Sequence, residues 1–536
     1  MRSKICRPPL NAERDEKMKY LIGIDVGTTA TKAVLYDEDT TIIGHFIKNY
    51  PIYRDSQGMA EQDPEEIFQA VETVIRAAIH RADLKTGRLL GVAFSTANQS
   101  LLLLDEHYHP LTRIITWADT RARQDAVKLK ETPEGKQLYQ KTGTPIHPMT
   151  PLAKLIWIRR KRPELFRQTH HVADIKSYIF WRLFKKFKVD LSVASCTGLL
   201  DIHTGKWDQA ALQLAGIDEK QLPLLAEPTS QETVMVESER QKMDVPHSTP
   251  FVYGAFDGAL SNIGVGAIKP NQIAITIGTS AAVRVITDRP VIDPEERLFC
   301  YMVDKKHWIV GGPLNNGGDV FQWAVHHLID QGALENEQVD RYTLANRIIE
   351  GTPTGSHGLL FHPYLGGERA PIWDANARGN FFGLTALHTR ADMLRAVLEG
   401  INFNIASVFE AVTKLVGKPQ SVTATGGFAR SKVWRQMLAD ILDCQVNVPV
   451  SFESGCLGAA ILVMQSIGIA SSYDVVANYL GDETEYDPQP QAVAVYKQLL
   501  PVFRQVEKLL APAYPTIANL QSELALLHGE DKMVLQ

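Results

Sequence analysis

The pattern of apolar and polar residues predicts two β-hairpins that lie far apart in the chain. The first covers residues 20–37, YLIGIDVGTTATKAVLYD, where a short glycine and threonine turn separates two apolar runs. The second covers residues 275–288, ITIGTSAAVRVITD. Apolar, β-branched runs on either side of a tight polar turn are typical of hairpins.

The two hairpin sequences form an internal repeat. Residues 275–288 align with residues 24–37 without a gap and match at Ile, Gly, Thr, Ala, Val and Asp positions. Such a repeat predicts a duplicated domain, with two turns that face each other across a cleft and hold one phosphate chain. Glycine allows close approach, while backbone N–H groups and threonine hydroxyls donate to phosphate. Taken alone, each turn fits a plain hairpin equally well.

The two copies differ at a position that matters for metal binding. Asp25 ends the first apolar run, and Thr276 takes its place in the second copy. A carboxylate beside a phosphate-binding turn can hold Mg²⁺ directly or through water. Only the first hairpin is therefore expected to serve the metal.

Two further apolar runs end in polar residues that are candidates for a cleft. Residues 89–95 predict a buried strand that leads into Asn98 and Gln99, and residues 251–256 predict a strand that ends at Asp257. Cleft residues of open α/β sheets follow the carboxyl ends of strands, so Asp257 is expected near the substrate and at a helix N-terminus. A simple helix cap is the alternative role, and both roles are compatible.

A nucleotide-binding arrangement is predicted in the second half of the chain. Residues 421–425 predict a strand, Gly426-Gly427 a turn, and residues 431–442 a helix. Glycines would leave a flat slot for adenine, and the helix N-terminus would add N–H donors. A tight connection without a ligand is the alternative. Other helices are predicted from Asp63-Pro64 onward and over 152–160, 392–412, 455–464 and 493–510.

Several predicted loops carry side chains suited to a polyol or a sugar acid. Trp117, Asp119 and Arg121 follow an apolar run, and an aromatic face packs on C–H groups while charged groups bind hydroxyls or an acid. A half-buried Trp beside a surface ion pair is the alternative. Lys176 and the pair Asn315-Asn316 are further donors. Because a carboxylate taken out of water needs charge-assisted partners, Arg121 is predicted to bind it.

Length and composition favour an enzyme of two or more domains acting on a small molecule. The chain has 536 residues and a net charge of -5, which gives no general attraction to nucleic acid or anionic membranes. No apolar run reaches membrane-spanning length. Five scattered cysteines without C-x-x-C spacing argue against disulfides and zinc and favour the cytoplasm. The sequence leaves a homodimer open.

The expected division has four parts. Residues 1–17 form a disordered extension, 18–268 a first domain, 269–480 a second domain, and 481–536 C-terminal helices packed on the core. Other nucleotide-binding motifs are absent from the sequence. Every Gly-Lys pair lacks the following Ser or Thr of a Walker A loop, and the only G-x-G start, at Gly264 and Gly266, continues to Lys269.

With these motifs assembled, the chain resembles the FGGY family of carbohydrate kinases from Met18 nearly to its C-terminus. The resemblance rests on IDVGTT at 24–29, GAFDG at 254–258, IGTS at 277–280 and TGGFARS at 425–431. It implies an α/β fold with duplicated actin-like, ribonuclease H-like ATPase domains, as two lobes around a central cleft. Within the family, the segments at 115–119, 311–318 and 363–371 look similar to gluconate kinases.

The resemblance also implies roles for individual residues. Asp257 would be the catalytic base and, with Asp25, a magnesium ligand. ATP would contact Gly27, Thr28, Thr29, Lys32, Gly278, Thr279, Ser280, Gly426, Gly427, Phe428 and Ser431. The sugar would contact Gln99, Trp117, Asp119, Arg121, Lys176, Asp257, Asn315 and Asn316.

The expected reaction is ATP-dependent phosphorylation of D-gluconate to 6-phospho-D-gluconate. A ketose such as xylulose is the alternative substrate within the family. An actin-like filament protein or chaperone ATPase is the alternative outside it, disfavoured by Asp257 and the Trp117 cluster. Glycerol kinases carry Arg-Glu where this chain has Ser100-Leu101, which argues against glycerol.

Overall fold

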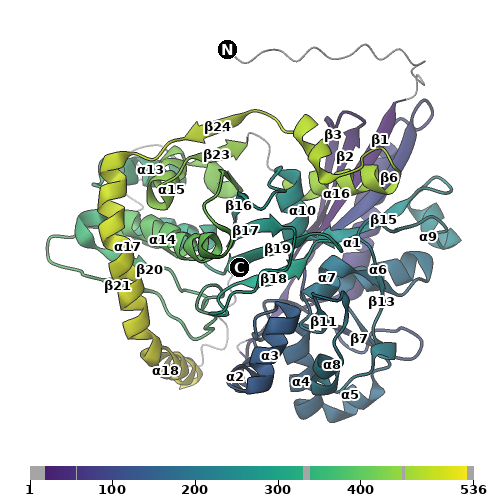
Figure 1. Ribbon diagram of the computed structural model, residues 1–536, viewed down its shortest axis with the longest axis horizontal. Helices are drawn as coiled ribbons and strands as arrows, with labels where there is room; N and C mark the ends of the chain where they lie inside the picture. The colour runs from purple at the N-terminus through teal and green to yellow at the C-terminus, as the bar shows by residue number, and fades with distance from the viewer. Residues whose placement is uncertain (1–17, 56, 330–338, 450–452, 528–536) are drawn as a thin grey trace.

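Two lobes, each built on its own β-sheet, make up the protein (Figure 1). The computed structural model describes residues 18–55, 57–329, 339–449 and 453–527. The expected extension over residues 1–17 lies outside the described residues. Within the described ranges, no helix combines the length and apolarity needed to cross a membrane.

The first lobe contains a six-stranded sheet in the order β14-β15-β6-β1-β2-β3. These strands are β1 (Lys19–Val26), β2 (Ala30–Asp37), β3 (Ile42–Asn49), β6 (Arg88–Thr96), β14 (Gln231–Glu232) and β15 (Phe251–Phe256). The helices that matter for the site are α1 (Pro64–Arg81), α4 (Pro151–Lys161), α6 (Ile175–Phe184) and α10 (Asp257–Gly264).

The second lobe contains a seven-stranded sheet in the order β18-β19-β17-β16-β22-β23-β24. Its strands are β16 (Gln272–Ile277), β17 (Ala281–Thr287), β18 (Phe299–Met302), β19 (Trp308–Leu314), β22 (Ser421–Thr425), β23 (Val446–Pro449) and β24 (Glu483–Tyr486). Its main helices are α11 (Gly318–Leu328), α13 (Arg341–Gly351), α14 (Arg390–Val416), α15 (Lys432–Leu442), α16 (Ser454–Ser466), α17 (Pro490–Leu510) and α18 (Tyr514–Leu527).

The two sheets repeat one pairing scheme. From β3 inward, successive pairs are antiparallel, antiparallel, parallel, parallel and antiparallel, ending at β14. From β19 inward to β24, successive pairs have the same five orientations in the same order. Both predicted hairpins are present, as β1-β2 and β16-β17. The prediction of a duplicated domain in two lobes is therefore confirmed, with β18 as an addition to the second sheet.

The central strands are apolar on both faces because helices cover both sides. In β1, Ile22 and Ile24 pack with α1 while Leu21 packs in the core that contains α16, and all three are fully buried. Helix α1 begins where the sequence predicts, since the Asp63 carboxylate caps it and Pro64 occupies its first turn. The apolar run before Trp117 forms β8 (Ile114–Ile115), a strand of two residues.

Helices α10 and α16 join the two lobes by a close backbone contact (Figure 1). A Cβ atom at Gly264 would lie 1.9 Å from the Ser454 carbonyl oxygen, and one at Gly458 would lie 2.1 Å from the Leu260 carbonyl oxygen. Gly23 of β1 makes the same kind of approach to Cys456. Helix α16 follows a strand of the second sheet but lies on the first, so these glycines fix how the lobes meet.

We predict that Gly458→Ala lowers the free energy of unfolding by about 1–3 kcal/mol, because the added methyl group forces two backbones apart. Denaturant unfolding of the whole chain measures the change. Gly351→Ala is the matched control, since a Cβ at the end of α13 meets nothing within 4 Å. Equal stability of the two variants would contradict the role given to the α10-α16 contact.

Candidate active site

The backbone carbonyl groups of the two hairpin turns are bound by donors from neighbouring segments. In the first turn, the Gly27 carbonyl accepts from Tyr50 Oη at 2.6 Å, and the Thr28 carbonyl accepts from Gln62 Nε2 at 2.6 Å. The C=O and N–H groups of a trans peptide point in opposite directions. The hydrogen bonds to the Gly27 and Thr28 carbonyls therefore turn the N–H groups of Thr28 and Thr29 away from Tyr50 and Gln62.

The second turn is held in the same way by different donors. The Gly278 carbonyl accepts from the Gly318 N–H at 2.7 Å, and the Thr279 carbonyl accepts from the Asp319 N–H at 3.2 Å. Both donors belong to the first turn of α11. The equivalent carbonyls of both hairpins are thus occupied, and both turns keep N–H groups for an anion.

Three parallel strands bring the acidic groups to one edge of the first sheet. Asp25 on β1 pairs in register with Ser95 on β6, and Ser95 pairs with Ala255 on β15, two residues before Asp257. The Ser95 hydroxyl donates to Asp25 Oδ1 at 2.7 Å. Asp257 opens α10, where the Gly258 N–H donates to its carboxylate at 2.7 Å. The predicted edge position of Asp257 is therefore present in the fold.

The pKa values of Asp25 and Asp257 are both raised. Burial raises the pKa of Asp25 to about 6, the hydrogen bond from Ser95 opposes this rise, and the charge of Asp257 adds to it. Burial also raises the pKa of Asp257, and the positive charge of Arg284 opposes that rise most strongly. The two acids are therefore close enough to repel each other, which is a setting that favours a divalent cation.

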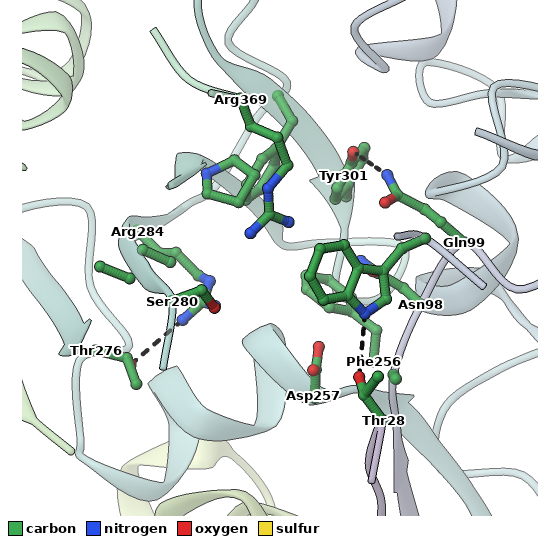
Figure 2. Close-up of a pocket in the computed structure, with 16 residues that line it drawn as sticks. Thr28, Asn98, Gln99, Phe256, Asp257, Thr276, Ser280, Arg284, Tyr301 and Arg369 are labelled. Carbon is green, nitrogen blue, oxygen red and sulfur yellow. Dashed lines mark hydrogen bonds between the residues drawn. The ribbon is translucent and has the colours of Figure 1, made fainter. Parts of the chain in front are cut away.

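A cavity of about 170 Å³ lies between the two turns and is lined by residues of both lobes (Figure 2). Asp257 is exposed to this cavity, and the guanidinium groups of Arg284 and Arg369 point into it from the second lobe. Desolvation lowers the pKa of Arg369 to about 10 and also lowers the pKa of Arg284. Both stay charged at neutral pH, so the wall opposite Asp257 is cationic.

Three of the predicted sugar-binding residues line this cavity, namely Asp257, Gln99 and Trp117. Gln99 Nε2 donates to Tyr301 Oη at 2.9 Å, which links the first lobe to β18 of the second. Trp117 Nε1 donates to Thr28 Oγ1 at 3.0 Å, and the Arg369 guanidinium lies 4.6 Å from the centre of its indole ring. One indole thus connects the first hairpin turn with the cationic wall.

The structure does not bring Asp119 and Arg121 to the cavity. Arg121 contacts two carboxylates, with 2.7 Å from its Nη2 to Asp119 and 2.5 Å from its Nη2 to Glu61. Asp119 also accepts from the Ala60 N–H at 3.0 Å. These bonds tie the segment after β8 to β5 (Ala60–Gln62), as in the alternative interpretation of an ion pair beside Trp117.

Lys176 is also away from the cavity. It is fully buried in α6, where its Nζ lies 2.7 Å from Asp190 and donates to the Ala255 carbonyl at 3.1 Å. This contact holds the end of β15 just before Asp257. Lys176 therefore acts on the acidic group through the backbone.

The Asn315-Asn316 pair binds a neighbouring loop. Asn316 Nδ2 donates to the Glu368 carboxylate at 2.9 Å, and the Asn315 N–H donates to the same carboxylate at 2.5 Å. Asn404 on α14 adds a third donor at 2.7 Å. This network fixes the segment that carries Arg369.

The predicted Gly-Gly turn lies against the second hairpin. Gly426 has a φ of 109°, and a Cβ there would lie 2.3 Å from the Ile277 carbonyl oxygen, so only glycine fits. A Cβ at Gly427 meets nothing within 4 Å. Phe428 is buried against Trp434, and Ser431 caps α15 while donating to Asn346 at 2.7 Å. The open face at Gly427 is thus the accessible part of this turn.

Magnesium fits the oxygen donors of Asp25 and Asp257. Within the described residues, no group of three or more His, Cys, Asp or Glu side chains forms a complete metal site. Mg²⁺ usually takes one or two protein carboxylates and completes its shell with water and phosphate. Asp25 and Asp257 match that donor set, and Lys32 lies opposite Asp25 in the β1-β2 pairing.

Sequence reasoning did not assign a role to Arg284, Arg369 or Tyr301. The repeat could have indicated a role for Arg284, because a charged residue stands there where the first hairpin has Ala33. Arg369 lies within the segment 363–371. Tyr301 belongs to an apolar strand and had no distinguishing pattern.

Comparisons with known proteins agree with this geometry. The N-terminal domain of the FGGY family of carbohydrate kinases matches residues 20–264, and the C-terminal domain of that family matches residues 273–467. The gluconokinase of Bacillus subtilis (strain 168) is 43% identical over 94% of this chain and 99% of its own length.

Two solved structures from Lactobacillus acidophilus are also similar, both at 39% identity. One, described as gluconate kinase, has a TM-score of 0.89 and covers 94% of this chain and 100% of its own. The other, described as ligand-bound xylulose kinase, has a TM-score of 0.88 and covers 93% and 100%. With both domain models matched and these identities over nearly its full length, the chain belongs to the FGGY family of carbohydrate kinases.

Proposed function

We propose that the protein phosphorylates D-gluconate to 6-phospho-D-gluconate with ATP. The observation that carries this proposal is the charge of the cavity. Among its lining residues Asp257 is the sole acidic side chain, while Arg284 and Arg369 supply two guanidinium groups. A sugar acid taken out of water needs such partners, and a neutral ketose does not. The similarity to gluconokinase supports the same substrate.

Xylulose is the second candidate substrate. A solved structure at 39% identity is described as a xylulose kinase, and the xylulose kinase of Escherichia coli (strain K12) is 31% identical over 92% of this chain. The cationic wall distinguishes the two candidates, because only the acid gains from it.

In the proposed reaction, Asp257 accepts the proton of the attacking hydroxyl as that oxygen bonds to the terminal phosphorus of ATP and the bond to ADP breaks. The two hairpin turns hold the phosphates through their N–H groups, and Gly427 faces the adenosine. Gly258 and the buried contact of Lys176 with Ala255 orient Asp257. Positioning and charge stabilisation supply most of the rate in such reactions.

Asp25 and Asp257 are the residues that would hold Mg²⁺. When bound, the ion neutralises charge on the phosphates. We place the protein in the cytoplasm, which the four described cysteines support because all are free thiols: Cys196, Cys300, Cys444 and Cys456. A homodimer stays a prediction.

The substrate assignment is tested by an ADP-release assay with gluconate, xylulose and glycerol. We expect the highest kcat/KM for gluconate, because it alone carries a carboxylate. A higher value for xylulose would overturn the assignment and leave the kinase activity standing.

Replacing the base should stop transfer and spare binding. We expect Asp257→Asn to lower kcat by about 10²–10⁴-fold, since the amide cannot accept the proton. The affinity for ATP should stay close to that of the parent because both hairpin turns and the Asp25 carboxylate are intact. Calorimetric titration checks binding, and steady-state kinetics check kcat. A variant with parental turnover would remove Asp257 from the mechanism.

The difference between the two hairpins predicts an unequal need for metal. Asp25→Asn should raise the Mg²⁺ concentration at half-maximal rate by about 10-fold or more, since it deletes a proposed ligand. Thr276→Val, at the equivalent position, should leave that concentration unchanged. If the Mg²⁺ concentration at half-maximal rate rose equally in both variants, Asp25 would have no special role in metal binding.

A further inference from the structure

We propose that Arg284 binds the carboxylate of the sugar acid and thereby sets the preference for an acid over a neutral sugar. This inference rests on the proposed function and assigns its specificity to one residue of the second hairpin. Arg121, the cation expected from the sequence, is not available for that role because Asp119 and Glu61 already bind it.

Arg284 has unused donor capacity. Its guanidinium makes one long hydrogen bond within the described residues, from Nη1 to Thr276 Oγ1 at 3.4 Å, and no ion pair. A guanidinium offers five N–H donors in a planar fork that matches a carboxylate. The side chain is half-buried in the cavity wall. A partly desolvated cation with almost no protein acceptor is complementary to an anionic ligand.

The duplicated hairpin shows that the fold does not require an arginine here. The equivalent residue of the first hairpin is Ala33, which is fully buried in the core. On β16 and β17, Thr276, Ala282 and Arg284 line the cavity, and the first two are small enough to leave space in front of the guanidinium. The arginine therefore replaces a packing residue at a position that faces ligand.

The neighbouring backbone makes room for this side chain. A Cβ at Gly258 would lie 2.8 Å from Arg284 Nε, so the glycine after Asp257 allows the guanidinium to lie against the first turn of α10. Figure 2 shows Arg284 and Asp257 directed toward the same space. One cavity thus offers a cation for the acid group and a carboxylate for the hydroxyl that reacts.

Arg369 is less suited to tell an acid from a neutral sugar. Its Nη2 donates to the Leu314 carbonyl at 3.1 Å, its guanidinium stacks on Trp117, and its neighbour Glu368 provides the largest balancing charge. Arg369 is thus built into the wall that every substrate meets. Its replacement should affect acids and neutral sugars alike.

The test compares D-gluconate with D-gluconamide, which has the same carbon chain and hydroxyls but a neutral amide in place of the carboxylate. For Arg284→Met we expect kcat/KM for gluconate to fall by about 10²-fold or more, mainly through KM. The value for gluconamide should change by less than about 3-fold. Arg284→Lys should recover part of the loss on gluconate, because it restores charge without the planar fork.

Two comparisons distinguish a failure of this inference from a failure of the proposed function. Equal losses on gluconate and gluconamide would overturn the inference and assign Arg284 to the phosphoryl group or to Asp257. A parent enzyme that prefers xylulose to gluconate would instead reject the proposed function. Arg369→Met serves as the contrasting variant, with similar losses expected on both substrates. Calorimetric ATP binding checks that each variant is folded, and Arg284→Gln replaces Arg284→Met if that variant fails this check.

Discussion

The backbone contact between α10 and α16 is the constraint on which the rest of the structure depends. Helix α10 begins at Asp257, and α16 begins beside Asp25, where a Cβ at Gly455 would lie 4.0 Å from the Asp25 carboxyl carbon. Each helix follows a strand of one sheet and packs toward the other lobe. Because glycines let the two backbones touch without intervening side chains, van der Waals contact between the backbones sets the distance between the lobes at this point.

Charge in the cavity follows from this arrangement. The contact brings the acidic edge of the first sheet to face the cationic wall of the second. Burial raises the pKa of Asp25 and Asp257 and lowers the pKa of Arg284 and Arg369, which means that the protein alone does not fully stabilise any of these charges. Under the proposed function, Mg²⁺ at the acidic wall and the sugar acid at the cationic wall would complete the charge balance.

Local patterns predicted the parts of the site that depend on local chemistry. The hairpin turns, the Asp257 position and the Gly426-Gly427 turn each follow from a strand and the few residues after it. The roles of the cationic residues were harder to predict because some of their partners are distant in sequence. Arg121 lies two residues from Asp119 but also contacts Glu61, and Lys176 pairs with Asp190, so both are held as ion pairs. Only the three-dimensional structure shows that most N–H donors of Arg284 have no protein acceptor among the described residues.

The duplicated sheets show that one arrangement of strands can carry different side-chain chemistry. Equivalent strands have the same pairing scheme, yet Asp25 and Thr276 differ, as do Ala33 and Arg284. A substitution on β17 can therefore alter one wall of the cavity without changing the side chains of the first hairpin. Two copies of one structural unit thus allow side chains to vary independently at two places that face the same cavity.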